Sequence, residues 1–213
     1  MDFVSGIIAL LAQWIAEIIR GSGYLGIFIL MSLESANIPI PSEIIMPFSG
    51  FLASMGNFSL WGVIIIGSLG NLFGSILSYF LASYIVKNRH KVGILRMLIS
   101  DDFLERANGY FKRYGSASVF FSRVLPVIRT FISLPAGLGK MNFAKFSLFT
   151  LVGSFFWSAM LAYLGWVLGN NWGILESYFR KFDVIVLAAL IAAGTYWFIH
   201  HFNVKIKKNR TRV

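Results

Sequence analysis

Residues 31–47 read MSLESANIPIPSEIIMP, and residues 119–135 read VFFSRVLPVIRTFISLP. Each stretch is largely apolar and contains prolines, yet each also carries two ionisable residues: Glu34 and Glu43 in the first, Arg123 and Arg129 in the second. A charged side chain at the centre of a lipid bilayer costs about 2.5–3.5 kcal/mol on insertion scales, so such residues usually face a cavity or one another. These four side chains are therefore the predicted functional site.

The composition predicts an integral membrane protein. The chain of 213 residues is 57% hydrophobic and only 13% charged, with a mean hydropathy of +0.71. Its net charge of +10 does not indicate a nucleic-acid partner, because the basic residues cluster beside apolar segments, where they act as topology signals and contact lipid surfaces. Cysteine is absent, which excludes disulfides and cysteine metal ligands.

The first part of the chain is predicted to contain short helices with a break. Residues 1–20 have apolar positions at helical spacing and form an amphipathic helix, which lies at the membrane interface or packs upright against the bundle. Its marginal length favours the interface. The apolar run 24–33 is too short to span, Pro39 and Pro41 break the helix after it, and a second short apolar run follows at 44–55.

Three later segments are predicted to cross the membrane. Residues 58–86 contain no charge, and at a rise of roughly 1.5 Å per residue they exceed a hydrocarbon core of about 30 Å. A basic cytoplasmic loop, a second proline-broken stretch, a second span, a C-terminal span and a basic tail follow, at residues 87–115, 116–141, 143–169, 183–202 and 203–213. The positive-inside rule places both basic clusters in the cytoplasm if the second proline-broken stretch dips into the bilayer and returns.

The two halves of the chain, 24–86 and 116–169, have the same organisation. Several residues recur between them at nearly constant spacing: Pro39 and Gly50 are matched by Pro126 and Gly137, and Asn57-Phe58 by Asn142-Phe143. By the charge distribution, the first broken helix enters the membrane from outside and the second from inside. The predicted fold is therefore a single all-α membrane domain over residues 1–213, built as an inverted repeat of two re-entrant broken helices, each followed by a transmembrane helix.

Three segments of the sequence resemble a known family. They are LESANIPIPSE at Leu33–Glu43, FSRVLPVIR at Phe121–Arg129 and GLGKMNFAKF at Gly137–Phe146. Together they are similar to the bacterial DedA family of the SNARE-associated Golgi, or VTT-domain, superfamily, over about residues 25–170. The resemblance implies a multi-pass protein of the bacterial inner membrane that serves envelope maintenance and lipid movement. The branch it resembles contains undecaprenyl phosphate translocases.

The resemblance also implies roles for the four ionisable residues, and their chemistry agrees with those roles. Glu34 and Glu43 match acidic positions that are essential in the family, and Arg123 and Arg129 match its essential arginines. The planar, permanently charged guanidinium suits a phosphate, so both arginines are the predicted phosphate ligands. Loss of hydration disfavours a charged carboxylate, so both glutamates are the predicted proton-coupling residues. We expect each glutamate to pair with an arginine when the site is empty.

Structural interpretations of the same residues stay open. The four charges also fit a static ion-pair cluster that holds two re-entrant loops together. The predicted loop-shaping residues are Pro39, Pro41, Ser42 and Pro126, and the prolines also fit simple helix kinks. Ser42 also fits an N-cap for the helix that Glu43 begins. Asn71 is a candidate polar lining residue, although a hydrogen bond to a neighbouring helix explains it better.

The predicted function is a proton-coupled flippase for undecaprenyl phosphate or a related anionic lipid carrier. Membrane phospholipids and protons are further expected partners, and homo-oligomerisation stays open. The alternatives are a phospholipid scramblase, for phosphatidylethanolamine for example, and a proton- or ion-coupled transporter that maintains membrane potential. An enzyme is not predicted, because a lipid phosphatase needs a nucleophile beside a base and only Ser42 and Ser122 come close. No cofactor or metal site is predicted, since His90, His200 and His201 lack companions at ligand spacing.

Overall fold

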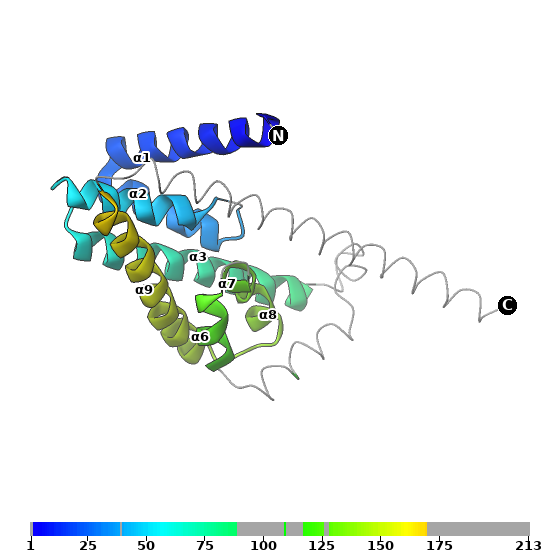
Figure 1. Ribbon diagram of the computed structural model, residues 1–213. Coiled ribbons are helices and arrows are strands. Elements are labelled where there is room, and N and C mark those ends of the chain that lie inside the picture. The colour runs from blue at the N-terminus through cyan, green and yellow to red at the C-terminus, as the bar shows by residue number, and fades with distance from the viewer. Residues whose placement is uncertain (1, 39, 89–108, 110–116, 126–127, 170–213) are drawn as a thin grey trace.

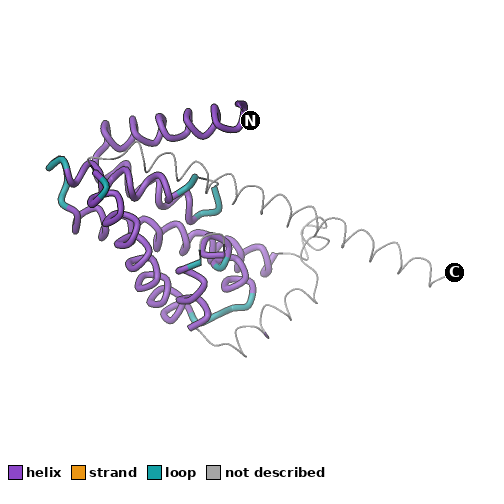
Figure 2. Tube along the Cα trace, viewed as in Figure 1, coloured by secondary structure: helices purple, strands orange, loops and turns teal. Residues whose placement is uncertain are grey.

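A computed structural model describes residues 2–38, 40–88, 109, 117–125 and 128–169 of the chain. Within these ranges every regular element is a helix (Figures 1 and 2). The predicted C-terminal span 183–202 and the basic tail lie outside the described residues, as do Pro39, Pro126 and nearly all of the basic loop 87–115. The fold of the predicted halves is nevertheless described almost completely.

Three of the helices are long and apolar enough to cross a membrane. They cover Leu10–Ser35, Leu60–Lys87 and Phe143–Val167. The second and third match the spans predicted at 58–86 and 143–169. The first joins residues 1–20 and 24–33, which the sequence predicts as separate segments. The prediction of an all-helical membrane protein is confirmed for the described residues.

The first helix, α1 (Asp2–Ser35), is interrupted by a single glycine. Gly23 has φ 60° and ψ −135°, a conformation that only glycine adopts without strain, so the helix divides where the sequence predicts a separation. The sequence leaves an interfacial and an upright position open for the first part of α1, and the structure shows that this part contacts the apolar core of the protein. Ile15 and Ile19 are fully buried in the same apolar core as Ile27 of the second part. Part of the apolar face of the N-terminal helix therefore packs against protein, while Trp14 on the same helix is exposed.

The second part of α1 and the helix that follows it form a helical hairpin. The chain leaves α1 at Ser35, turns through residues 36–41, and enters α2 (Ser42–Ser54). Pro41 occupies the N-cap of α2 in extended conformation. A short connection then leads into the long helix α3 (Leu60–Asn88), which packs against α1. We call residues 24–54 the first hairpin.

The second half repeats this order with shorter helices. It contains α6 (Ala117–Val124), α7 (Ile128–Phe131) and α8 (Ser133–Leu138), which together make up the second hairpin. The long helix α9 (Phe143–Val167) follows, and the side chain of Asn142 caps its start by accepting a hydrogen bond from the backbone N–H of Lys145 at 3.1 Å. α6 packs against α9, as α1 packs against α3.

The two halves are joined by an exchange of contacts between hairpins and long helices. α2 of the first hairpin packs on α9, α8 of the second hairpin packs on α3, and α3 and α9 contact each other (Figure 1). Glycines sit at these contacts: Gly50 faces the backbone of Ala162, Gly165 faces the carbonyl of Pro47, and Gly137 faces the carbonyl of Tyr79. Small residues let helix backbones approach closely where lipid offers no hydrophobic driving force.

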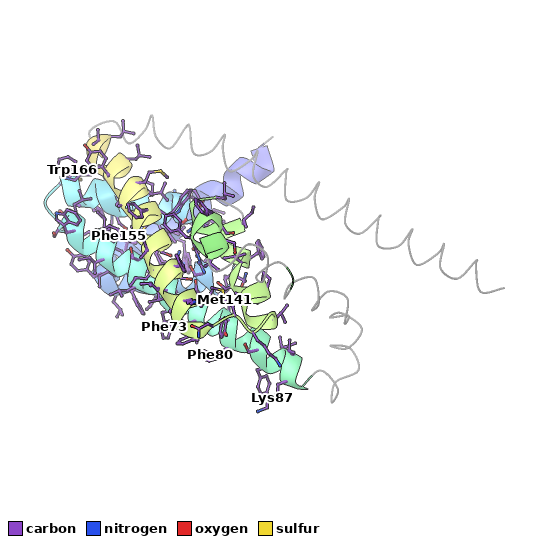
Figure 3. All side chains as sticks on the ribbon, turned by 90° about the horizontal axis from the view of Figure 1, so that it is seen from below. Phe73, Phe80, Lys87, Met141, Phe155 and Trp166 are labelled. Atoms are coloured by element: carbon purple, nitrogen blue, oxygen red, sulfur yellow. The ribbon has the colours of Figure 1, made fainter. Side chains whose placement is uncertain are left out.

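The outer surface of the long helices is apolar. Phe73, Phe80 and Trp166 are each more than two-fifths exposed, as expected of side chains that face lipid. Figure 3 shows Lys87 and Trp166, close to the ends of α3 and α9, at opposite ends of the described molecule. The apolar outer surface of these helices agrees with a membrane protein.

We predict that Gly165→Ala destabilises the protein, because its new methyl group would meet the backbone carbonyl of Pro47, which cannot rotate away. Overpacking of this kind costs about 1–3 kcal/mol. The free energy of unfolding can be measured by denaturation in mixed detergent micelles. Gly21→Ala is the matched control, since Gly21 is helical, exposed and has no atom within 4 Å of its added methyl. Equal stability of the two variants would contradict the close α2–α9 packing.

Candidate functional site

The tips of the two hairpins meet in the interior. Asn37 lies in the turn of the first hairpin with φ 70°, a left-handed conformation that asparagine tolerates better than most residues. Its amide nitrogen donates a hydrogen bond to the backbone carbonyl of Thr130 in the second hairpin at 3.1 Å, and its oxygen accepts one from Ser78 of α3 at 2.8 Å. The turn is therefore fixed against both the opposite hairpin and a long helix.

A buried ion pair lies beside this contact. Nη2 of Arg129 is 2.5 Å from Oε1 of Glu34, and the two side chains are 3% and 6% exposed. The hydroxyls of Thr130 and Ser35 each donate a further hydrogen bond to this carboxylate at 3.2 Å. Because buried charges are strongly desolvated, each member of such a pair needs the other.

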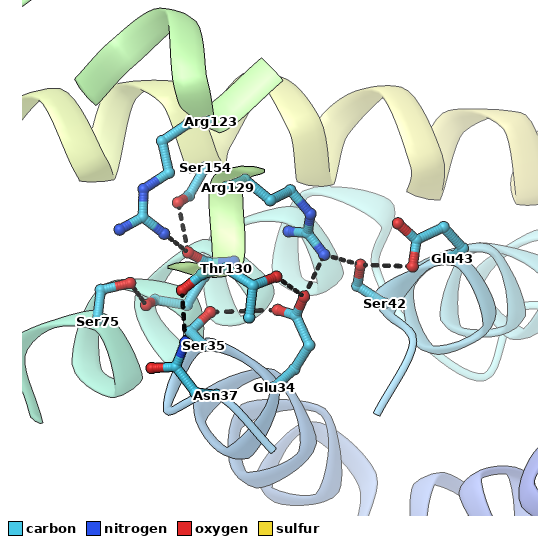
Figure 4. Close-up of polar contacts among 11 residues, drawn as sticks. Glu34, Ser35, Asn37, Ser42, Glu43, Ser75, Arg123, Arg129, Thr130 and Ser154 are labelled. Carbon is cyan, nitrogen blue, oxygen red and sulfur yellow. Dashed lines mark hydrogen bonds and ion pairs between the residues drawn. The ribbon is translucent and has the colours of Figure 1, made fainter. Parts of the chain in front are cut away.

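Ser42 connects this pair to the second glutamate (Figure 4). Its hydroxyl accepts a hydrogen bond from Nη2 of Arg129 and donates one to Oε2 of Glu43 at 3.3 Å. Glu43 is only half-buried, whereas Ser42 is fully buried. On another side of Arg129 the ring of Trp157 lies 4.9 Å from the guanidinium carbon, at cation–π distance. Consecutive side-chain contacts thus connect Glu43, Ser42, Arg129 and Glu34, from a partly exposed carboxylate to a buried one.

Arg123 has a different environment. It is 1% exposed, and it donates hydrogen bonds to Oδ1 of Asn71 at 3.1 Å and to the hydroxyl of Ser133 at 2.8 Å. Its Nε is buried without a partner among the described atoms. The expectation that each glutamate pairs with an arginine is therefore met only by Glu34 and Arg129. Within the described residues, the hydrogen-bond partners of Arg123 are neutral oxygens.

The structure brings the four predicted ionisable residues into one region from four elements, α1, α2, α6 and α7. Their roles as phosphate ligands and proton carriers stay predictions. Ser42 does not cap α2, since Pro41 holds the cap position and no side chain caps it. Ser42 is instead the first residue of the helix and serves Arg129. Asn71 makes a contact between helices, as the structural interpretation expected, and that contact includes Arg123.

Several residues of this region were not predicted from the sequence: Asn37, Thr130, Ser133, Ser154 and Trp157. Thr130 and Ser133 follow Arg129 closely, so their polarity within an apolar stretch was a usable signal. Ser154 lies on one face of α9 with Ser147, Thr150 and Ser158, and this helical spacing was readable as well. No sequence signal points to Trp157, because aromatic residues are frequent along this chain.

This arrangement suits an anion. Two permanently charged guanidinium groups, hydroxyls and a carboxylate gather where water is scarce, and charge-assisted hydrogen bonds are strong there. Among the described residues, no three His, Cys, Asp or Glu side chains gather as a metal site would require. The donors present would bind a phosphate or carboxylate, and the carboxylates would bind protons or compete for the arginines.

Comparisons with known proteins find one family model and several relatives that match the chain. Residues 40–167 match the VTT domain. The chain is 34% identical to undecaprenyl phosphate transporter A of Staphylococcus aureus, over 89% of this chain and 95% of the relative. It is 32% identical to the protein of the same name in Bacillus subtilis, over 83% of this chain and 88% of the relative.

A further relative carries a different kind of name. An alkaline phosphatase-like protein of Lactococcus lactis subsp. cremoris is 32% identical, over 87% of this chain and 90% of the relative. No solved structure shows a significant match to the chain.

We predict that Glu34→Gln lowers the free energy of unfolding by about 3–5 kcal/mol, because it leaves the guanidinium of Arg129 buried without its counter-charge. Combining it with Arg129→Gln should lose less than the sum of the two single changes, because the pair is then removed together. Denaturation in mixed micelles measures all three values. Glu17→Gln, at an exposed position of α1, is the control for the substitution itself. Strict additivity of the two single effects would show that the ion pair contributes nothing.

Proposed function

The chain belongs to the VTT-domain family, also called the DedA family, and on that premise we propose that it is a flippase for undecaprenyl phosphate or a closely related anionic lipid carrier. One observation carries the proposal. Arg123 and Arg129 are buried in the region where the hairpins meet, and Arg123 has neutral oxygens as its hydrogen-bond partners among the described residues. A buried, unneutralised guanidinium is costly unless an anion repays it.

The packing of the halves supports an inverted repeat with re-entrant hairpins. Gly70 of α3 faces the carbonyl of Phe28 and Cβ of Met31, and Gly153 of α9 faces the carbonyl of Phe120 and Cβ of Arg123. In each case a glycine of the long helix lies close to two groups of the preceding hairpin. One is a backbone carbonyl, and the other is the Cβ atom of the residue three positions later.

The second limbs of the hairpins correspond in the same way. Gly50 in α2 and Gly137 in α8 are matched by the sequence repeat, and each lies against the backbone of the opposite long helix, at Ala162 and Tyr79. In transporters built from inverted repeats, discontinuous helices place the substrate site at the repeat interface near the bilayer midplane. On this proposal the polar region between the hairpin tips is that site.

The ion pair suggests how transport could be coupled to protons. In the proposed cycle, a lipid phosphate first engages Arg123 and then competes with Glu34 for Arg129. Once released, the carboxylate of Glu34 is buried without a counter-charge and takes up a proton, since burial disfavours its charged form. Glu43 is half-buried and connected to Arg129 through Ser42, so it is the proposed residue at which protons enter or leave.

This cycle modifies the expected scheme in one respect. The structure contains one Glu–Arg pair among the described residues, so one exchange of partners, at Arg129, replaces the two that were expected. The proposed location is the bacterial inner membrane, with both basic clusters facing the cytoplasm. The basic clusters themselves lie almost wholly outside the described residues.

We predict that the reconstituted protein accelerates exchange of labelled undecaprenyl phosphate between vesicle leaflets, and that a pH difference changes the rate. Arg123→Ala and Arg129→Ala should each slow exchange about tenfold or more, because a hydrogen bond to a charged group contributes about 1.5–3 kcal/mol. Glu43→Gln should remove the response to the pH difference. Arg20→Ala, at an exposed arginine of α1 outside the site, is the matched control and should leave exchange unchanged.

Parallel trials separate the rival functions. Exchange of phosphatidylethanolamine at an equal rate would favour a general scramblase, and proton flux without added lipid phosphate would favour a proton conduit. Release of inorganic phosphate from the lipid would favour the enzymatic activity suggested by the name of the Lactococcus relative. A response to the pH difference that survives in both Glu34→Gln and Glu43→Gln would refute the proton-coupling scheme.

A further inference from the structure

We propose that Asn71 is a positioning residue that holds Arg123 oriented and unneutralised, ready for the phosphate of the lipid. The inference rests on the proposed function, because it takes Arg123 as the residue that first receives the anion. Asn71 is a polar side chain in the middle of the apolar helix α3, and the packing of α3 alone does not require a polar residue there. The inference gives this side chain a specific role.

The hydrogen bonds of Asn71 define its orientation. Arg123 is a donor only, so the atom facing it must be the amide oxygen of Asn71. The same oxygen accepts a second hydrogen bond from the hydroxyl of Ser154 in α9 at 2.7 Å. Both lone pairs of the oxygen are thereby used, and the amide cannot rotate without losing two hydrogen bonds in a buried place. Asn71 itself is 1% exposed.

The backbone around Asn71 is held equally firmly. Gly70, next to it, faces the carbonyl of Phe28 in α1, and the hydroxyl of Ser75 one turn later donates to the carbonyl of Asn71 at 2.7 Å. Across the site, Gly153 lies against Cβ of Arg123, so any larger residue would push the arginine away. The hydrogen bond between Asn71 and Ser154 thus joins α3 to α9 at the same amide oxygen that contacts the guanidinium group of Arg123.

The choice of an amide matters because a carboxylate would do something different. Arg129 is held by Glu34, whose charge opposes the binding of a second anion. Asparagine offers an acceptor oxygen of the same geometry without the charge. Among the described residues no carboxylate forms a hydrogen bond with Arg123, so its donors are not committed to an anion, while its position is fixed through Asn71 and Ser133. Its unpartnered Nε is a further donor for an incoming ligand.

The test is to replace Asn71 by its charged near-isostere. Asn71→Asp keeps the shape and the acceptor oxygen but adds a negative charge beside Arg123. The probe is dodecyl phosphate, a single-chain lipid phosphate, titrated into purified protein in a neutral detergent. We expect Asn71→Asp to weaken its binding at least tenfold while thermal stability is unchanged or raised by the new ion pair. Binding of dodecyl trimethylammonium, which carries the opposite charge, should not weaken.

A second variant covers failure of the first to fold. Ser154→Ala removes one of the two hydrogen bonds that orient the amide, and we expect it to weaken dodecyl phosphate binding by about threefold to tenfold. Ser158→Ala, at a buried serine of α9 without a hydrogen-bond partner among the described atoms, is the matched control and should bind as the unaltered protein does. Together these variants separate the orientation of Arg123 from general packing of the helix.

The outcomes distinguish a positioning role of Asn71 from a purely structural one. Undiminished binding by Asn71→Asp, or failure of the unaltered protein to bind dodecyl phosphate, overturns the inference, because a purely structural asparagine tolerates an isosteric acid. Weakened binding supports it, and so does a loss of binding in Ser154→Ala when Asn71→Asp does not fold. If binding behaves as expected but vesicles show no exchange of undecaprenyl phosphate, the proposed transport function fails while the role of Asn71 stands.

Discussion

The ion pair between Arg129 and Glu34 is the contact on which the rest of the structure depends. Neither charge can be buried alone without a large loss of hydration, and the two residues belong to hairpins that lie far apart in the sequence. Burying both requires the hairpin tips to meet, and their meeting requires the long helices α3 and α9 to lie against each other. Ser35, Thr130 and Ser42 supply further hydrogen bonds to the pair, which keeps its geometry defined.

The two arginines are chemically alike but held in different ways, and this asymmetry is central to the proposed function. Arg129 is matched by a carboxylate, so it can exchange one anion for another. Arg123 is matched by an amide and a hydroxyl, so among the described residues no carboxylate forms a hydrogen bond with its buried guanidinium. Its Cβ lies against Gly153 of the following long helix, as the Cβ of Met31 lies against Gly70 in the first half. A transporter with one such charge attracts an anion without trapping it between two bare cations.

Much of this architecture was predictable from the sequence, for identifiable reasons. Charges such as Glu34 and Arg123 within apolar stretches are conspicuous, and the long, mainly apolar runs at 58–86 and 143–169 are typical of membrane-spanning helices. Gly23 was a readable break. The pairing of Glu34 with Arg129, and of Arg123 with Asn71, was not predictable, because it depends on how α3 and α9 cross. Serines such as Ser133 and Ser154 were not predicted. A single sequence does not distinguish a serine that only lets two membrane helices pack closely from one that forms hydrogen bonds within a polar site. The length and the apolar face of the N-terminal helix leave an interfacial and an upright position open, because the sequence does not show which surface that face packs against.

The exchange of second limbs between the halves has a mechanical consequence. α2 lies against α9, α8 lies against α3, and glycine-to-backbone contacts leave little slack at either place. Each hairpin therefore packs closely against the long helix of the opposite half. A movement of either hairpin is expected to move that helix as well. If the proposed transport function holds, a rearrangement that moves one hairpin would also have to move the long helix of the opposite half, which would couple the two halves of the molecule.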